Sequence, residues 1–192
     1  PDAAWVAQTK TSFLQAQAAL QARCDKELLD AGAQELLTLE SISRDPAFLQ
    51  ADKIVSRSKE ALQRFRHDLA DLAASLQLKV EASGFAGPAG QQTALDVLRF
   101  GLAQVLPLYQ KEVNRKVELL RQARSAMEQM ISQGAHWRAG DSPGRRLIFD
   151  QPEDQARFML IVDGFARERE ALAKDAEAPM KRITAPALSC ML

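Results

Sequence analysis

The stretch ADKIVSRSKEALQRFRHDLADLAASL, residues 51–76, decides the fold of this chain. Its apolar or small side chains recur at alternating intervals of four and three residues, at Ala51, Val55, Ser58, Leu62, Phe65, Leu69, Leu72 and Leu76. An interval that averages about 3.5 residues is the repeat of a helix that packs one face along neighbouring helices. The pattern therefore predicts a long helix in a helical bundle, and we expect this helix to end at Gly84.

A second long helix is predicted before residues 51–76. It begins after Asp2, a good N-cap, and its apolar stripe continues to about Ile42. Gly32 lies inside this stripe, and glycine disfavours the helix interior, so we expect a bend or break there. The segment SRDP, residues 43–46, then supplies a cap and a proline at the first position of the helix that follows.

A third helix is predicted after the glycine-proline loop GFAGPAGQQ, residues 84–92. The segment TALD, residues 93–96, has the form of a capping box that opens this helix, and Gly134 is a natural C-terminal cap. At 1.5 Å per residue, about 40 helical residues make a rod of about 60 Å. We therefore expect an elongated molecule.

A fourth helix follows the cap signal DQPE, residues 150–153, and carries one stripe of spaced residues. The stripe consists of Phe158, Ile161, Phe165, Glu168 and Leu172, in which Glu168 is an anomaly because it places a charge in an apolar series. The prediction is an all-α fold. We expect one elongated up-down four-helix bundle over residues 1–192, a short β-hairpin-like insertion between the last two helices, and an extended C-terminal tail over 179–192.

The composition indicates a globular protein with an aliphatic core, because 46% of the 192 residues are hydrophobic and only 6% are aromatic. Lys and Arg residues number 25, and Asp and Glu residues also number 25, so the formal net charge is zero. No overall electrostatic field draws such a chain to nucleic acid. No run of residues approaches the roughly 18 to 20 apolar side chains that a transmembrane helix needs, so we expect no transmembrane segment.

The segment HWRAGDSPGRRLIF, residues 136–149, departs from helical spacing. Its centre, GDSPG, suits a turn, and aromatic and β-branched residues flank it, so the pattern predicts a short hairpin. Two interpretations are open. The hairpin is either a structural plug at one end of the bundle or a contact surface for a partner. In the second case the binding side chains are Trp137, Arg138, Arg145, Arg146 and Phe149.

A second candidate site lies at FGLAQVLPLY, residues 100–109. Pro107 cannot donate a backbone hydrogen bond, so it frees the carbonyl of Ala103 and is expected to kink its helix. In the structural interpretation the kink only curves a long helix. The functional alternative is a small-ligand-binding sensor bundle. Its pocket, between the helices, is lined by Gly101, Gln104, Pro107 and Tyr109.

The sequence contains no pattern typical of catalysis or metal binding. His67 and His136 are far apart, and no CxxC, HExxH or ExxH spacing is present. There is no GxSxG motif, and the segment GFAGPAG lacks both the preceding strand and the lysine of a phosphate-binding loop. We therefore expect no cofactor, no metal site and no enzymatic activity.

These observations favour a non-enzymatic protein-interaction or scaffold module, a helical bundle with coiled-coil spacing whose Trp/Arg hairpin at 136–149 contacts a protein partner. Nucleic acid is not an expected partner. The first helix is rich in alanine, and this is compatible with close helix approach either inside the monomer or across a homodimer. The residues concerned are Ala16, Ala18, Ala19 and Ala22.

The cellular compartment stays open at this level. The chain opens with Pro1 and Asp2 and not with methionine, which we interpret as trimming or processing. We expect a soluble protein, either in the cytoplasm or, if a leader was removed, in a bacterial envelope or periplasm. Cys24 and Cys190 are either two idle thiols or, in an oxidising compartment, a disulfide.

Overall fold

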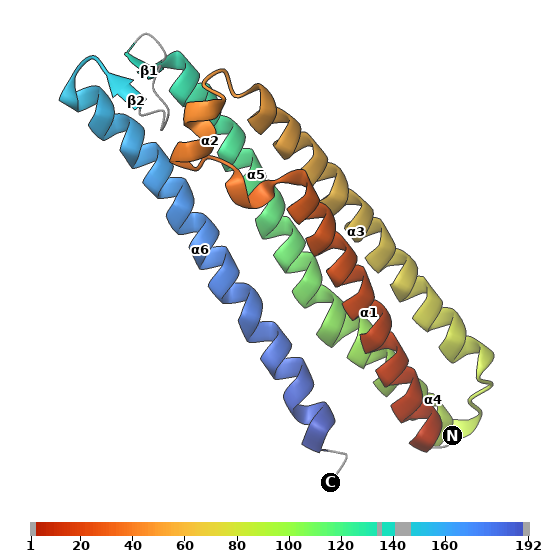
Figure 1. The fold of residues 1–192 in the computed structure, drawn as a ribbon. Coiled ribbons are helices and arrows are strands. Elements are labelled where there is room, and N and C mark those ends of the chain that lie inside the picture. The colour runs from red at the N-terminus through yellow and green to blue at the C-terminus, as the bar shows by residue number, and fades with distance from the viewer. Residues whose placement is uncertain (1–2, 134–135, 141–146, 190–192) are drawn as a thin grey trace.

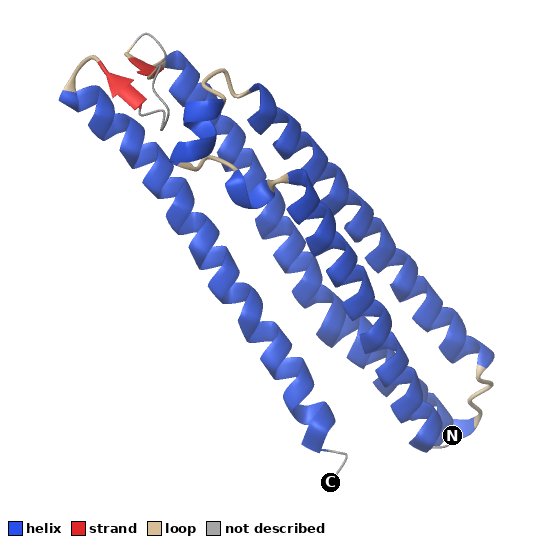
Figure 2. Cartoon of the chain, in the orientation of Figure 1, coloured by secondary structure: helices blue, strands red, loops and turns tan. Residues whose placement is uncertain are grey.

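A computed structural model describes residues 3–133, 136–140 and 147–189, with side chains described up to residue 174. Within these ranges, four long rods lie alongside one another (Figure 1). They are α1 (Ala3–Ala31), α3 (Leu49–Ala82), the run of α4 (Gly87–Leu98), η2 (Arg99–Val105) and α5 (Leu106–Ser132), and α6 (Pro152–Ser189). Figure 2 shows two short strands at one end of the bundle. The predicted all-α bundle with a hairpin insertion is confirmed.

The predicted face of α3 is buried between α1 and α5. All eight positions of the seam in residues 51–76 are buried except Leu72, which is half-buried. Ion pairs along the edges show that the neighbours run antiparallel to α3. Arg64 pairs with Glu27 of α1 at 2.8 Å, and Asp68, later in α3, pairs with Arg23, earlier in α1. Asp52 pairs with Arg124 of α5 at 2.6 Å, and Arg66, later in α3, donates to Asn114, earlier in α5, at 2.7 Å.

The connection from α1 to α3 is compact. α1 ends at Ala31, and Gly32 adopts a φ of 84°, a left-handed conformation that glycine accepts without steric cost. The predicted break at Gly32 is therefore confirmed. Two short helices follow, η1 (Ala33–Glu35) and α2 (Leu39–Arg44), and the connection buries Leu36, Leu37 and Ile42 in the core.

Asp45, rather than Pro46, determines where α3 begins. The carboxylate of Asp45 accepts hydrogen bonds from the backbone N–H groups of Leu49, Gln50 and Ala51, at 3.0, 2.6 and 3.1 Å. Phe48 adopts a φ of 55° and is buried. The prediction of a helix that starts at Pro46 was wrong. The chain makes a turn at residues 45–48 that buries the Phe48 ring, and α3 starts only after this turn.

The predicted loop over 84–92 and the capping box at 93–96 are also wrong. The reversal after α3 needs only the residues around Gly84, whose φ is 66°, and α4 already begins at Gly87. Pro88 lies in the first turn of α4, where its fixed φ suits a helix and its missing N–H costs nothing. Thr93 is inside the helix, and its hydroxyl donates to the carbonyl of Ala89 at 2.9 Å.

The irregularity expected at Pro107 takes the form of a π-helical segment, η2, directly before it. The N–H of Leu106 donates to the carbonyl of Gly101, one residue further back than in an α-helix. Gly101 is buried where the rod passes α1 and α3. A Cβ atom at Gly101 would lie 2.3 Å from Cδ2 of Leu76 and 3.3 Å from Cζ of Phe13.

α6 packs on α5 and on the connection between α1 and α3. Its buried side chains are Phe158, Val162, Phe165 and Leu172. The guanidinium of Arg169 donates to the backbone carbonyls of Gln34 at 2.9 Å and of Leu36 at 3.3 Å. These hydrogen bonds join α6 to the segment that includes η1, and they hold α6 on the side of α5 where that segment lies.

The expected extended tail over 179–192 is wrong for residues 179–189, which continue α6. The neighbours of Pro179 and Pro186 include alanine, methionine and lysine, which favour helix. A proline inside such a segment bends the helix without ending it. Residues 190–192, and with them Cys190, lie outside the described residues. In the described residues, no helix combines the length and the apolar character required to cross a membrane.

We predict that Gly101→Ala destabilises the protein by about 1 to 3 kcal/mol, because a methyl group there overlaps a buried leucine that has little room to move. Gly164→Ala is the matched control. It lies inside α6 with no atom within 4 Å of the place a Cβ would take, so we expect it to stabilise by about 0.5 to 1 kcal/mol. Urea denaturation of both variants measures the difference, and equal effects at the two sites would contradict the close packing of η2.

Candidate functional site

The predicted hairpin is confirmed. It consists of β1 (Trp137–Ala139) and β2 (Leu147–Phe149), which are antiparallel with Trp137 opposite Phe149. Trp137 is 7% exposed, and its indole N–H donates to the carbonyl of Met130 at 2.9 Å. Its ring meets the rings of Phe48 and Phe158 edge-on, with centroids 6.2 and 4.9 Å apart. This geometry supports the plug interpretation, since the side chain seals the bundle and offers no anchor to a partner.

The other candidate residues of the hairpin are divided. Phe149 is half-buried, and its ring lies 5.3 Å from that of Phe158, so it belongs to the same aromatic cluster. Arg138 is exposed, as is Ile148 in the facing strand. Arg145 and Arg146 lie outside the described residues. Of the predicted contact set, Arg138 is the described side chain that faces solvent.

The structure does not bring the predicted pocket residues together around one cavity. Gly101 is buried against α3, and Tyr109 is buried against α1, where it hydrogen-bonds Gln17. Gln104 and Pro107 are exposed on the outer side of the rod. The four residues therefore lie on opposite faces of one helix, and Pro107 is the one that lines a groove.

A polar seam runs along the contact between α1 and α5. Besides the bond of Gln17 to Tyr109, the ammonium of Lys116 lies 2.7 Å from Glu112 and 3.3 Å from Asp25. Gln17 is 2% exposed, and among the described residues its amide nitrogen has no hydrogen-bond partner. Buried polar groups destabilise a fold unless they are hydrogen-bonded, and clusters of them are frequent at functional sites.

The ionisable groups of this seam are held in unreactive forms. Burial raises the pKa of the Cys24 thiol to about 11, so the nucleophilic thiolate is scarce near neutral pH. Burial likewise raises the pKa of Tyr109. For Lys116, burial acts to lower the pKa, but the bonds to Glu112 and Asp25 outweigh it and the net shift is upward. These groups do not form a nucleophile or an acid-base pair poised for neutral pH.

The histidines do not assemble a metal site in the part of the chain that the structure describes. There, no three His, Cys, Asp or Glu side chains are grouped so as to hold an ion. His67 is exposed on α3, 3.6 Å from Asp71, and His136 lies 3.9 Å from Asp154. Both are surface pairs of the kind that contribute little to stability.

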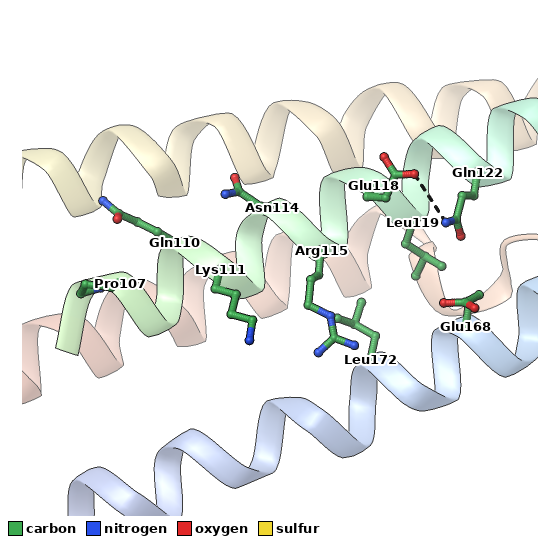
Figure 3. A pocket seen from close by; sticks show the side chains of 10 residues that line it. All are labelled: Pro107, Gln110, Lys111, Asn114, Arg115, Glu118, Leu119, Gln122, Glu168 and Leu172. Atoms are coloured by element: carbon green, nitrogen blue, oxygen red, sulfur yellow. Dashed lines mark hydrogen bonds between the residues drawn. The ribbon is translucent and has the colours of Figure 1, made fainter. Parts of the chain in front are cut away.

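An open groove follows the outer face of α5, where α6 lies beside it. Its lower section, the one farther from the hairpin, has a volume of about 480 Å³ and includes Pro107. Leu119 of α5 and Leu172 of α6 both line this section, while Lys111 and Arg115 extend from α5 toward α6 (Figure 3). The section is therefore apolar at its base and charged along its edge.

The upper section of the groove, nearer the hairpin, has a volume of about 290 Å³. Leu160 of α6 is 68% exposed along it. Gly164 lies one turn further on, and the absence of atoms within 4 Å of its missing Cβ leaves room in the groove. A glycine inside a helix costs about 1 kcal/mol relative to alanine, and no contact within the described residues requires it here.

The two sections are adjacent, because both are lined by Gln122 and Glu168, and together they follow the outer face of α5. Along α5 the lining positions extend from Pro107 to Gln129. At 1.5 Å per residue this is a length of about 33 Å. We take this groove, defined by the outer face of α5 from Pro107 to Gln129 and the facing side of α6, as the candidate functional site.

Sequence reasoning did not predict the groove, but it singled out two residues that line it, Pro107 and Glu168. Glu168 was anomalous in the apolar stripe of the last helix, and the structure shows it exposed where the two sections join. Gly164 is a second signal, since a helix-interior glycine without a turn to explain it is unusual. Neither signal identifies a groove without knowing that α6 lies against this side of α5.

Comparison with protein-family models, with curated proteins and with solved structures found no match to this chain.

We predict that Trp137→Phe costs about 1 to 3 kcal/mol of unfolding free energy, because the ring contacts remain while the carbonyl of Met130 loses its buried donor. Trp137→Ala removes the ring contacts as well as the hydrogen bond, and is expected to lower the free energy of unfolding by about 3 to 5 kcal/mol. Arg138→Ala, on the exposed side of the same strand, is the control and should be nearly neutral. Urea denaturation followed by circular dichroism measures all three, and a neutral Trp137→Ala would contradict the plug.

We predict a loss of stability at alkaline pH, because the pKa values of Cys24, Tyr109 and Lys116 are all raised. Each proton is held more tightly in the folded state, so the stabilisation is complete below the unfolded pKa and is lost as the pH rises through the folded pKa. For Cys24 this window runs from 9.0 to about 11. The urea midpoint should fall across this window, and less steeply in Cys24→Ala. A midpoint that is constant up to pH 11 would overturn the assignment.

Proposed function

We propose that the protein is a non-enzymatic interaction module that docks an α-helical segment of another protein in the groove between α5 and α6. The observation that carries this proposal is the length of the groove, about 33 Å, in line with two neighbouring helices. The groove between two neighbouring helices can accommodate a third helix, and binding of a helix in a groove is a recurrent mode of protein recognition. The buried Trp137 favours this surface over the hairpin.

The chemical character of the groove suits a protein surface. Leu160 and Leu119 offer apolar contact, and Gln110, Gln122 and Gln129 offer amide groups at intervals along the length. An apolar centre with a polar rim is the usual composition of such interfaces. Exposed Leu160 and the open space beside Gly164 also form a place where an apolar side chain of a partner can pack.

The small-ligand alternative has one observation in its favour. The lower section includes Pro107, and about 480 Å³ lies within the range of ligand pockets. Against it, Gly101, Gln104 and Tyr109 do not line this section, most of its walls are exposed, and the groove continues well past the size of a small molecule. The length therefore favours the helix.

We predict that a photoreactive amino acid placed at Gln110, Gln122 or Gln129 cross-links to one helical segment of one partner, in extracts of cells that naturally make the protein. Because these positions are separated by 12 and 7 residues on α5, the adducts should map to partner residues about 12 and about 7 positions apart, if the docked helix lies nearly parallel to α5. Mass spectrometry of the adducts measures these spacings.

The control for this experiment is the same photoreactive group at His67, which is exposed on α3 away from the groove. It should yield no such adduct. Gly164→Leu, whose Cβ has open space around it and whose longer side chain occupies the upper section, should abolish the adducts while the melting temperature is kept. Adducts that map to unrelated segments would contradict docking of a helix. Adducts to a second copy of this chain would replace the proposed partner by a homodimer.

A further inference from the structure

The charges that line the groove divide into paired and unpaired groups. Glu118 and Arg121 pair with each other at 2.6 Å, and Arg115 also has an interaction within the protein. Lys111 and Glu168 are both exposed, and neither has an ion-pair partner among the described side chains. Among the side chains that the structure describes, the groove therefore presents Lys111 and Glu168 as charges without an ion-pair partner.

These two free charges lie at different levels of the groove. Lys111 is in the lower section, one turn from Pro107, whereas Glu168 is where the two sections meet, beside Leu119 and Gln122 (Figure 3). Measured along α5, the separation is 8 to 11 residues, or about 12 to 16 Å. At this distance the two side chains cannot pair with each other, so within the described part of the chain each is available to an external charge.

Resting on the docking role proposed above, we infer that the partner helix carries an acidic side chain opposite Lys111 and a basic side chain opposite Glu168, which fixes the direction in which it lies. Residues that are 8 or 11 positions apart share one face of a helix, so both charges fit on the face that contacts the groove. The acidic end of this helix lies toward Pro107 and the basic end toward Gln129.

Charge complementarity of this kind selects orientation more than it adds affinity. An exposed ion pair changes an equilibrium by roughly two- to fivefold, which is small beside the burial of apolar side chains along the groove. In the reversed direction both contacts become like-charge pairs, so the two effects act together against it. A helix of the opposite polarity is therefore disfavoured although the same apolar contacts are available to it.

The test uses a display library of 22-residue helical peptides. The positions of the contact face are randomised among Ala, Leu, Glu and Lys, and the other faces are fixed. The library is selected against the wild-type chain and against the charge-swapped double variant Lys111→Glu with Glu168→Lys. Both substitutions are on exposed side chains, so the fold is expected to be kept, and circular dichroism checks this. Gly164→Leu is the control that blocks the upper section.

For the wild type, the enriched peptides are expected to carry Glu and Lys 8 or 11 positions apart, and the double variant is expected to enrich the reverse arrangement. A representative wild-type peptide should bind the double variant at least fivefold more weakly by fluorescence anisotropy. Enriched peptides whose charges are random would overturn this inference and leave helix docking intact. No enrichment over the input, with Gly164→Leu indistinguishable from wild type, would overturn both the inference and the docking role.

Discussion

The seam of α3 between α1 and α5 is the contact on which the rest of the structure depends. An apolar face repeated every 3.5 residues must be covered along its whole length, and antiparallel neighbours on both sides do this. The ion pairs Arg64 with Glu27 and Asp52 with Arg124 set the directions of these neighbours. α6 packs on the other side of α5, where Phe158, Val162 and Phe165 join the same core and Arg169 contacts the backbone between α1 and α3.

The groove follows from that peripheral placement. α6 leans to the side of α5 that η1 occupies, because Arg169 binds the carbonyls of Gln34 and Leu36. The opposite side of the contact is left open along α5. Lys111 and Arg115 extend from α5 toward α6 in the section of the groove that includes Pro107 (Figure 3). The groove therefore results from the position at which α6 packs on α5. The exposed residues that line it are not needed for the core and are available to bind a partner.

Much of the fold is predictable from sequence, and the errors have local physical causes. Periodicity identified the seam of α3, the break at Gly32 and the hairpin, because each depends on spacing or turn chemistry within one segment. Tertiary contacts determined the features that sequence did not predict, among them the start of α3 and the start of α4. Burial of Phe48 delayed the start of α3, and a short reversal at Gly84 let α4 begin before the apparent capping box. Trp137 fits either a plug or a contact surface in sequence, and only its bond to Met130 distinguishes them. The groove needed the relative placement of two helices, which no local pattern contains.

The central claim is that α3, covered by α1 and α5 on two sides, is the most stable element, whereas α6 packs on one side of α5 and its attachment leaves the groove beside it. Amide hydrogen exchange, resolved residue by residue by NMR under native conditions, tests this most directly. The account predicts that the amides around Leu62 to Leu69 exchange only through global unfolding, whereas those of α6 beyond Phe165 exchange through a smaller opening with a lower free energy. Equal opening free energies in α3 and α6 would contradict it, since the two would then unfold as one cooperative unit.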